Sequence, residues 1–75
     1  MMGVGMAAVM TVPDDLGRMA WRKGEATKRM MDPGERHQVI VEKLVGVEDE
    51  LLARCELDGG WFMLVNVRCL EAVVQ

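Results

Sequence analysis

Aromatic and metal-binding side chains are scarce in this 75-residue chain. It has no tyrosine, one phenylalanine, two tryptophans, one histidine and two cysteines. Structural zinc sites need four ligands, commonly in close pairs such as Cys-x₂-Cys, whereas His37, Cys55 and Cys69 are widely spaced. A Cys–His nucleophilic pair also needs a third group that orients the base. We therefore predict no metal, no cofactor and no catalytic residues, and we do not expect an enzyme.

Long hydrophobic runs are also missing. The opening MMGVGMAAVMTV has no basic residue, is interrupted by glycines and is too short to cross a bilayer. Two cysteines without a secretory signal are typical of reduced thiols in the cytoplasm. We expect a cytoplasmic protein that does not act on membranes, with Cys55 and Cys69 as free thiols.

Charge is unevenly distributed along the chain, although the net charge is only −3. Residues 13–31 carry +2, and residues 32–75 carry −5. Opposite charges in two segments favour docking of one on the other, within a chain or between copies. The acidic larger part argues against a protein whose main task is to grip the phosphate backbone of nucleic acid.

The chain is long enough for one domain, which we divide into three segments. Residues 1–12 are predicted to be a flexible arm, with addition to the edge of a sheet as an equal alternative. Residues 13–31 are predicted to be an amphipathic basic helix, and residues 35–75 a small antiparallel β domain. The expected fold class is therefore α+β. A chain of this size buries only about 60% of its unfolded surface, so self-association is a common supplement to stability.

The helix prediction depends on apolar residues that recur at steps of three and four, from Leu16 through Met19 and Ala20 to Met30. Asp14 and Asp15 are suited to the helix start, and Lys28 and Arg29 to its end. Gly17 and Gly24 each cost about 1 kcal/mol relative to alanine, so the helix needs a surface to lie on. The sequence DPGE at 32–35 is expected to end it.

The β prediction is strongest around the Gly-Gly turn after Asp58. Branched and apolar residues at 37–46, 51–57 and 61–67 are typical of strands. A three-residue loop at 58–60 would pair Leu57 with Trp61, Cys55 with Met63, Ala53 with Val65 and Leu51 with Val67. This register puts only apolar residues on one face, which a two-residue loop does not. Trp61 and Cys55 are thus predicted to lie in the core.

The same register leaves large apolar residues on the opposite face. Phe62, Leu64 and Leu52 share that face with Arg54 and Glu56. A cluster of exposed apolar side chains needs a cover, which the basic helix, the first strand or a second copy could provide. We predict that Phe62, Leu64 and Leu52 form an interface, with a dimer or higher homo-oligomer, or an unidentified protein, as partner.

The order of strand, loop, strand, tight glycine turn, long strand, 3₁₀-like turn and short last strand resembles SH3-like small β-barrels. The residues that carry it are HQVIVEKLVG, LLARCELDGGWFMLV and NVRCLEAV, roughly the last half of the chain. The ending is similar to that of type II dihydrofolate reductases, whose pore carries a Val-Gln-Ile-Tyr motif. Here the matching residues are Met63 to Asn66, so reductase activity is not implied, and the resemblance concerns fold far more than function.

Two functional hypotheses remain. The first is a small non-enzymatic binding or adaptor module that self-associates through its apolar sheet face. The second is a nucleic-acid-binding regulator that uses the basic helix over 16–30. Its candidate binding residues are Arg18, Trp21, Arg22 and Arg29, with Lys23 beside them, because cations next to an indole suit a nucleic acid. A small oligomeric enzyme with its active site in a pore between barrels is a distant third.

Overall fold

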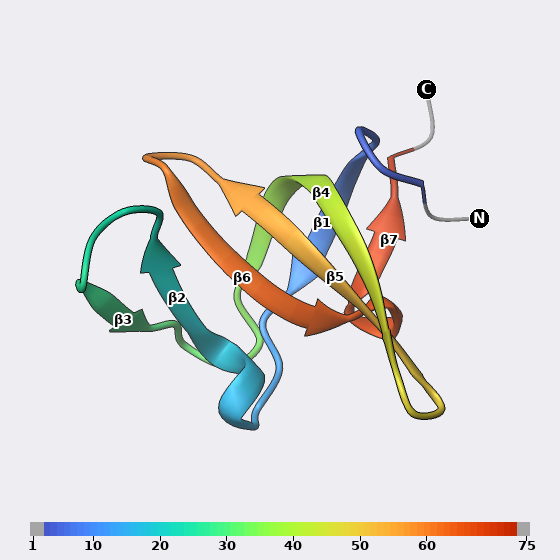
Figure 1. Ribbon diagram of the computed structural model, residues 1–75, viewed down its shortest axis with the longest axis horizontal. Coiled ribbons are helices and arrows are strands. Elements are labelled where there is room, and N and C mark those ends of the chain that lie inside the picture. Colours follow the sequence, from blue (N-terminus) through green and yellow to red (C-terminus); the bar gives the residue numbers. More distant parts are fainter. Residues whose placement is uncertain (1–2, 74–75) are drawn as a thin grey trace.

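The computed structural model describes residues 3–73, which form one curved antiparallel sheet of seven strands (Figure 1). The strands are β1 (Ala7–Thr11), β2 (Met19–Arg22), β3 (Lys28–Met30), β4 (Arg36–Val47), β5 (Glu50–Leu57), β6 (Trp61–Asn66) and β7 (Leu70–Ala72). Two 3₁₀ turns, η1 (Leu16–Arg18) and η2 (Val67–Cys69), precede β2 and β7. The strand order is β3-β2-β6-β5-β4-β1-β7, so β3 and β7 are the two edges.

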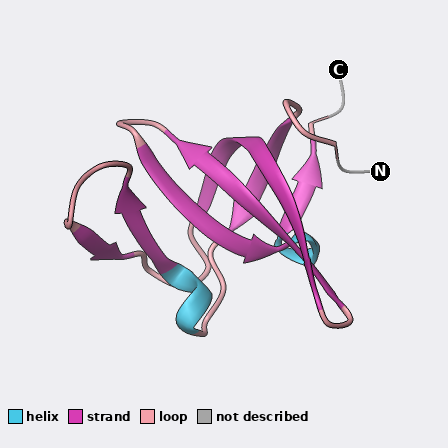
Figure 2. Cartoon of the chain, viewed as in Figure 1, coloured by secondary structure: helices cyan, strands magenta, loops and turns pink. Residues whose placement is uncertain are grey.

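The predicted helix over 13–31 is wrong, and with it the α+β fold class. This segment forms η1 and the β2–β3 hairpin, and the described residues contain no α-helix (Figure 2). Gly24 adopts a φ of +79° in the connecting turn, a conformation that a helix cannot contain. The fold is therefore all-β, and the β domain begins well before residue 35.

Pairing with β6 explains why the segment is extended. Ala20 of β2 lies opposite Met63 of β6, and both side chains are fully buried. Met31, just after β3, is buried in the same core. Only a few apolar residues of this segment reach the core, and alternation along two short strands is enough to bury them. Backbone hydrogen bonds to the edge of β6 satisfy the polar groups of the extended segment. A helix over the same residues would have been weakened by its two glycines.

The flexible arm predicted over 1–12 is corrected for its second half. β1 pairs with β4 on one side and with β7 on the other, so residues 7–11 are an internal strand of the sheet. Ala8 and Met10 are fully buried, whereas Thr11 is exposed. Residues 7–11 therefore join the sheet, as in the alternative to a flexible arm, but as an internal strand rather than at its edge. Met1 and Met2 lie outside the described residues.

The predicted register of the glycine hairpin is confirmed. β5 and β6 pair Leu57 with Trp61, Cys55 with Met63 and Ala53 with Val65. Gly59 and Gly60 both have positive φ, +83° and +78°, which glycine adopts without steric cost. The further pairing of Leu51 with Val67 does not form, because β6 ends at Asn66 and Val67 begins the 3₁₀ turn η2.

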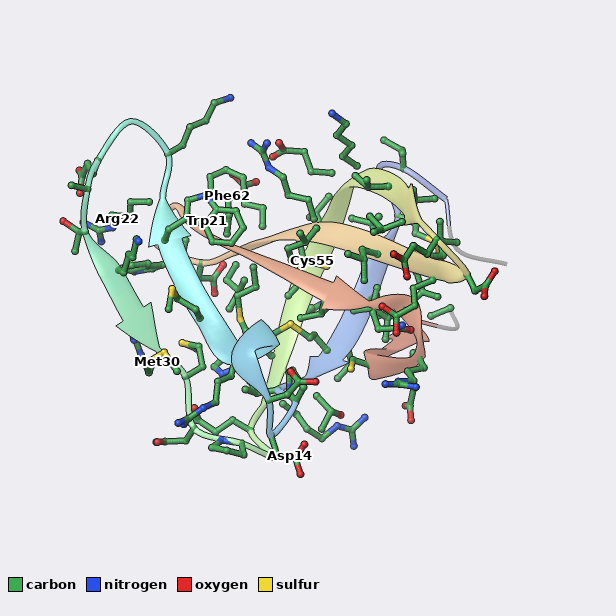
Figure 3. The ribbon with its side chains drawn as sticks, turned by 60° about the horizontal axis from the view of Figure 1, so that its bottom comes forward. Asp14, Trp21, Arg22, Met30, Cys55 and Phe62 are labelled. Atoms are coloured by element: carbon green, nitrogen blue, oxygen red, sulfur yellow. The ribbon has the colours of Figure 1, made fainter. Side chains whose placement is uncertain are left out.

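A β-bulge in β4 increases the curvature of the sheet. The pairing with β5 shifts between Val41 and Lys43, so Glu42 is an extra residue on β4. Bulges bend a strand and increase its twist. The concave face then encloses a core of thirteen buried side chains contributed by every long strand. Cys55 is part of this core, as predicted (Figure 3). Trp61 is half-buried and packs against the core.

Among residues 3–73, no helix is long and apolar enough to cross a membrane.

Candidate functional site

Phe62, the first residue of the predicted interface, is covered by its own chain. Its side chain is only 5% exposed, although it points away from the main core cluster. The guanidinium carbon of Arg54 lies 5.0 Å from the centroid of its ring. Arg54 is held by an ion pair of 2.9 Å with Glu42, the bulge residue. Trp21 is paired with Phe62 on the neighbouring strand (Figure 3), so Phe62 is not free to bind a partner.

Leu64 and Leu52, the other two predicted interface residues, line a groove. Leu64 is 38% exposed, and Leu52 is half-buried. The groove has a volume of about 590 Å³ and lies between residues 13–17, the start of β5, the end of β6 and η2. We call this surface the acidic groove, because three carboxylates line it, those of Asp14, Asp15 and Glu50.

The walls of the acidic groove are held by local hydrogen bonds. The backbone N–H of Gly17 donates to Oδ1 of Asp15 at 2.8 Å, which shapes the turn into η1. On the opposite wall, the backbone N–H of Arg68 donates to Oδ1 of Asn66 at 3.0 Å and caps η2. Asp14 is exposed beside η1 (Figure 3). The groove therefore combines an apolar floor with three carboxylates and one cation, Arg68.

The two cysteines are free thiols in different environments. Burial, with a smaller contribution from nearby Cys69, raises the pKa of Cys55 to about 11. Cys69 lines the acidic groove and is partly exposed. Its pKa is also raised, mainly by burial and further by Asp15, against the opposing effect of Arg68. A thiol with a raised pKa is a poor nucleophile at neutral pH.

The basic residues predicted to bind nucleic acid are only partly brought together. Arg22 and Arg29 both lie against the indole of Trp61, with guanidinium carbons 4.8 Å and 5.6 Å from its ring centroid. We call these three residues the Arg-Trp-Arg cluster. Lys23 is exposed in the turn that follows Arg22.

Arg18 and Trp21 lie apart from that cluster. Nη1 of Arg18 donates to the carbonyl of Met31 at 3.4 Å, which ties η1 to the end of β3. Trp21 points to the opposite face of β2 from Arg22, because neighbouring side chains alternate along a strand. The four predicted residues therefore do not form a single site, since they are divided among η1, β2 and β3 rather than aligned on one face of a helix.

Sequence reasoning missed two features of these surfaces. Trp61 was predicted as core, yet it is half-buried and carries both arginines. Asp14 and Asp15 were predicted as helix-start residues, yet they face Leu64 across the acidic groove. Alternation of Arg22 with Trp21 was a signal for a strand, but nothing local indicated that β6 would be its neighbour.

His37 lies near a carboxylate rather than near the thiols. Its Nε2 is 3.6 Å from Oε1 of Glu35. Within residues 3–73, no three side chains of histidine, cysteine, aspartate or glutamate are grouped so that they could hold a metal ion.

Comparison of the chain with protein-family models, with curated proteins and with solved structures gives no match. The geometry of the two surfaces is therefore what bears on function.

Proposed function

We propose that this protein is a small non-enzymatic protein-binding module, and that its acidic groove holds a short segment of a partner that carries apolar and cationic side chains. One observation carries the proposal: Leu52 and Leu64 lie in the same groove as Asp14, Asp15 and Glu50. Apolar contact supplies affinity, and the carboxylates select a cationic neighbour.

The size of the groove supports a short segment rather than a large interface. A volume of about 590 Å³ lies in the range of about 300–1,000 Å³ that is typical of small ligand sites. A site of this size holds only a few side chains, and small interfaces are typical of weak and transient encounters. The expected partner therefore inserts a few side chains and exchanges rapidly.

Self-association is the special case of this proposal in which a second copy of the chain occupies the acidic groove. Two copies would not pair groove to groove, because their carboxylates would repel each other. Phe62, which was expected to lead the interface, is buried. A second copy would instead have to insert its cationic β2–β3 hairpin, so a partner protein is the occupant to which we commit.

We also propose that the domain is an SH3-like barrel module of a reducing compartment such as the cytoplasm. The order of its elements supports the first part, since β4, β5 and β6 follow one another as neighbours and β7 follows η2 and pairs with β1. Two free thiols in so small a domain support the second.

The test is a titration of ¹⁵N-labelled protein with the peptide Ser-Leu-Lys-Ser-Leu-Arg-Ser, followed by amide chemical shifts. We expect shifts at Asp15, Leu52, Leu64 and Asn66. The peptide Ser-Leu-Glu-Ser-Leu-Asp-Ser should cause none, because its carboxylates face those of the groove. Leu64→Glu should abolish the shifts, whereas Ile40→Glu should not, since Ile40 is similarly exposed (44%) but lies outside the groove.

Three results would contradict the proposal. Equal shifts with both peptides would show that charge selects nothing. Shifts confined to other surfaces would place the binding site elsewhere. A stable oligomer by light scattering that Leu64→Glu dissociates would make a second copy the occupant.

A further inference from the structure

The β2–β3 hairpin concentrates positive charge at one edge of an otherwise acidic domain. Residues 18–30 contain five cations and one acid, a net charge of +4, so the rest of the chain carries −7. β3 is the edge strand, and all three of its residues are exposed. We propose that this hairpin and Trp61 form a second binding site, for the phosphate backbone of nucleic acid.

The Arg-Trp-Arg cluster is the centre of the proposed site. Two guanidinium groups of like charge share one indole, at 4.8 Å and 5.6 Å from its ring centroid. Stacking on an aromatic ring holds arginine planes in place while their N–H groups stay available at the edges. Arg22 on β2 and Arg29 on β3 are therefore hydrogen-bond donors whose positions are already ordered before an anion binds.

Neither arginine is neutralised within the described chain. The ion pairs among residues 3–73 join Arg36 to Glu71 and Arg54 to Glu42, and His37 lies near Glu35. None of them includes Arg22, Arg29, Lys23 or Lys28. Bringing such cations together costs energy through mutual repulsion, and an external anion would remove that cost.

Two hollows, one beside Arg29 and Trp61 and one beside Arg22, leave room for anionic oxygens. A cavity of about 130 Å³ is lined by Arg29, His37 and Trp61, with Asp58 also at its wall. A shallower depression of about 390 Å³ is lined by Arg22, Lys23 and the glycines of the β5–β6 turn, with Glu25 beside them. Each arginine therefore has open space next to it. The first hollow has one arginine and one carboxylate in its wall, and the second has two cations, Arg22 and Lys23, and one carboxylate.

The arrangement favours a repeating polyanion over a single phosphate or a lipid surface. Arg22, Lys23, Lys28 and Arg29 are spread over two strands, with about 3.3 Å per residue along a strand and about 4.8 Å between strands. Cations spaced in this way meet several phosphates of one backbone. A membrane surface would also require a broad apolar face, and on this hairpin only Met30 (46%) is a large exposed apolar side chain.

The acidic remainder of the domain makes the site directional. Its charge of −7 repels a polyanion from the acidic groove and from the opposite sheet edge. The nucleic acid is therefore steered to one edge, and no part of the acidic groove is used. The inference stands independently of the proposed function, and its test uses different residues.

The experiment measures fluorescence anisotropy of labelled oligothymidine of about 20 nucleotides, and of a duplex of that length, from about 50 to 200 mM salt. We expect salt-sensitive binding. Arg22→Gln with Arg29→Gln should weaken it by about tenfold and reduce the logarithmic salt slope for the single strand by about 1.4, two phosphates at about 0.7 each. Arg36→Gln with Lys43→Gln removes the same charge from exposed positions on β4 and should change the affinity by less than about twofold.

A second variant tests the same site without changing the two arginines that contact Trp61, whose replacement could disturb the fold. Lys23→Gln with Lys28→Gln changes only exposed side chains and should reduce the slope by a similar amount. The inference is overturned if no oligonucleotide binds at low salt, or if the β4 control weakens binding as much as the hairpin variants. It is also overturned if vesicles with an anionic lipid bind and the oligonucleotides do not.

Discussion

At the scale of single residues, burial decides what the polar and reactive groups can do. Arg54 is the clearest example, because it closes over Phe62 while its charge is satisfied by Glu42. The long side chain covers an apolar ring on the outer face of the sheet, and its charged end pairs with Glu42 at 2.9 Å. This contact explains why an apolar residue predicted to need a partner is buried within the chain.

The buried thiol of Cys55 makes stability depend on alkaline pH. Its pKa is about 11 in the folded protein against an ordinary value of 9.0. The folded state therefore favours the protonated thiol. The stability that the buried, protonated thiol contributes is fully present below pH 9 and is lost as the pH rises toward 11. Above about pH 9 we expect the free energy of unfolding to fall by about 1 kcal/mol per pH unit through this group.

Urea denaturation of the wild type and of Cys55→Ala, at about pH 8 and about pH 10, measures this effect. Alanine is expected to lower stability at both pH values through lost packing, but to reduce the additional loss at high pH. A residual slope is expected from Cys69, whose pKa is raised in the same direction. Identical pH dependence in the two proteins would mean that Cys55 ionises normally in the fold.

At the scale of elements, tight turns and strand alternation explain most of the hairpins. The β5–β6 hairpin follows from sequence because two glycines mark its turn and alternate residues separate cleanly into two faces. The β2–β3 hairpin was not predictable in the same way. Its apolar residues fit a weak helical stripe as well as two short strands, and only the free edge of β6 distinguishes them.

A comparison of two glycines tests the turn. Gly60→Ala should destabilise the protein by about 1 kcal/mol, because alanine at a φ of +78° is strained even though nothing lies within 4 Å of the added Cβ. Gly46→Ala adds the same methyl group to β4, also with open space and without a positive φ. It should be neutral or slightly stabilising. Chemical denaturation measures both, and equal effects would contradict the role assigned to the turn conformation.

At the scale of the whole molecule, β1 joins the edge strand β7 to the rest of the sheet. It is the partner of β7, which has no other neighbour in the sheet, and it also pairs with β4. Its inward side chains, Ala8 and Met10, are part of the single core. In a domain this small there is little other buried surface to compensate for their loss.

Neighbouring substitutions in β1 test this point. Met10→Asp places an unpaired carboxylate in the core and should abolish the cooperative thermal transition, because its cost is a large part of the total stability of about 5–15 kcal/mol. Thr11→Asp adds the same charge at an exposed position and should change stability by about 0.5 kcal/mol or less. Circular dichroism during heating distinguishes the two. A folded Met10→Asp protein would mean that β1 is dispensable, as expected of a flexible arm.

The sequence by itself determined the parts of this protein that depend on near neighbours. The register of β5 with β6, the burial of Cys55, the turn at Gly59 and Gly60 and the uneven charge all follow from residues close together in the chain. Only the tertiary structure decided that residues 13–31 form strands, that Arg22 and Arg29 meet Trp61, and that Asp14 faces Leu64. The physical reason is that each of these depends on a strand edge or side chain more than thirty residues away, whose position no local pattern specifies.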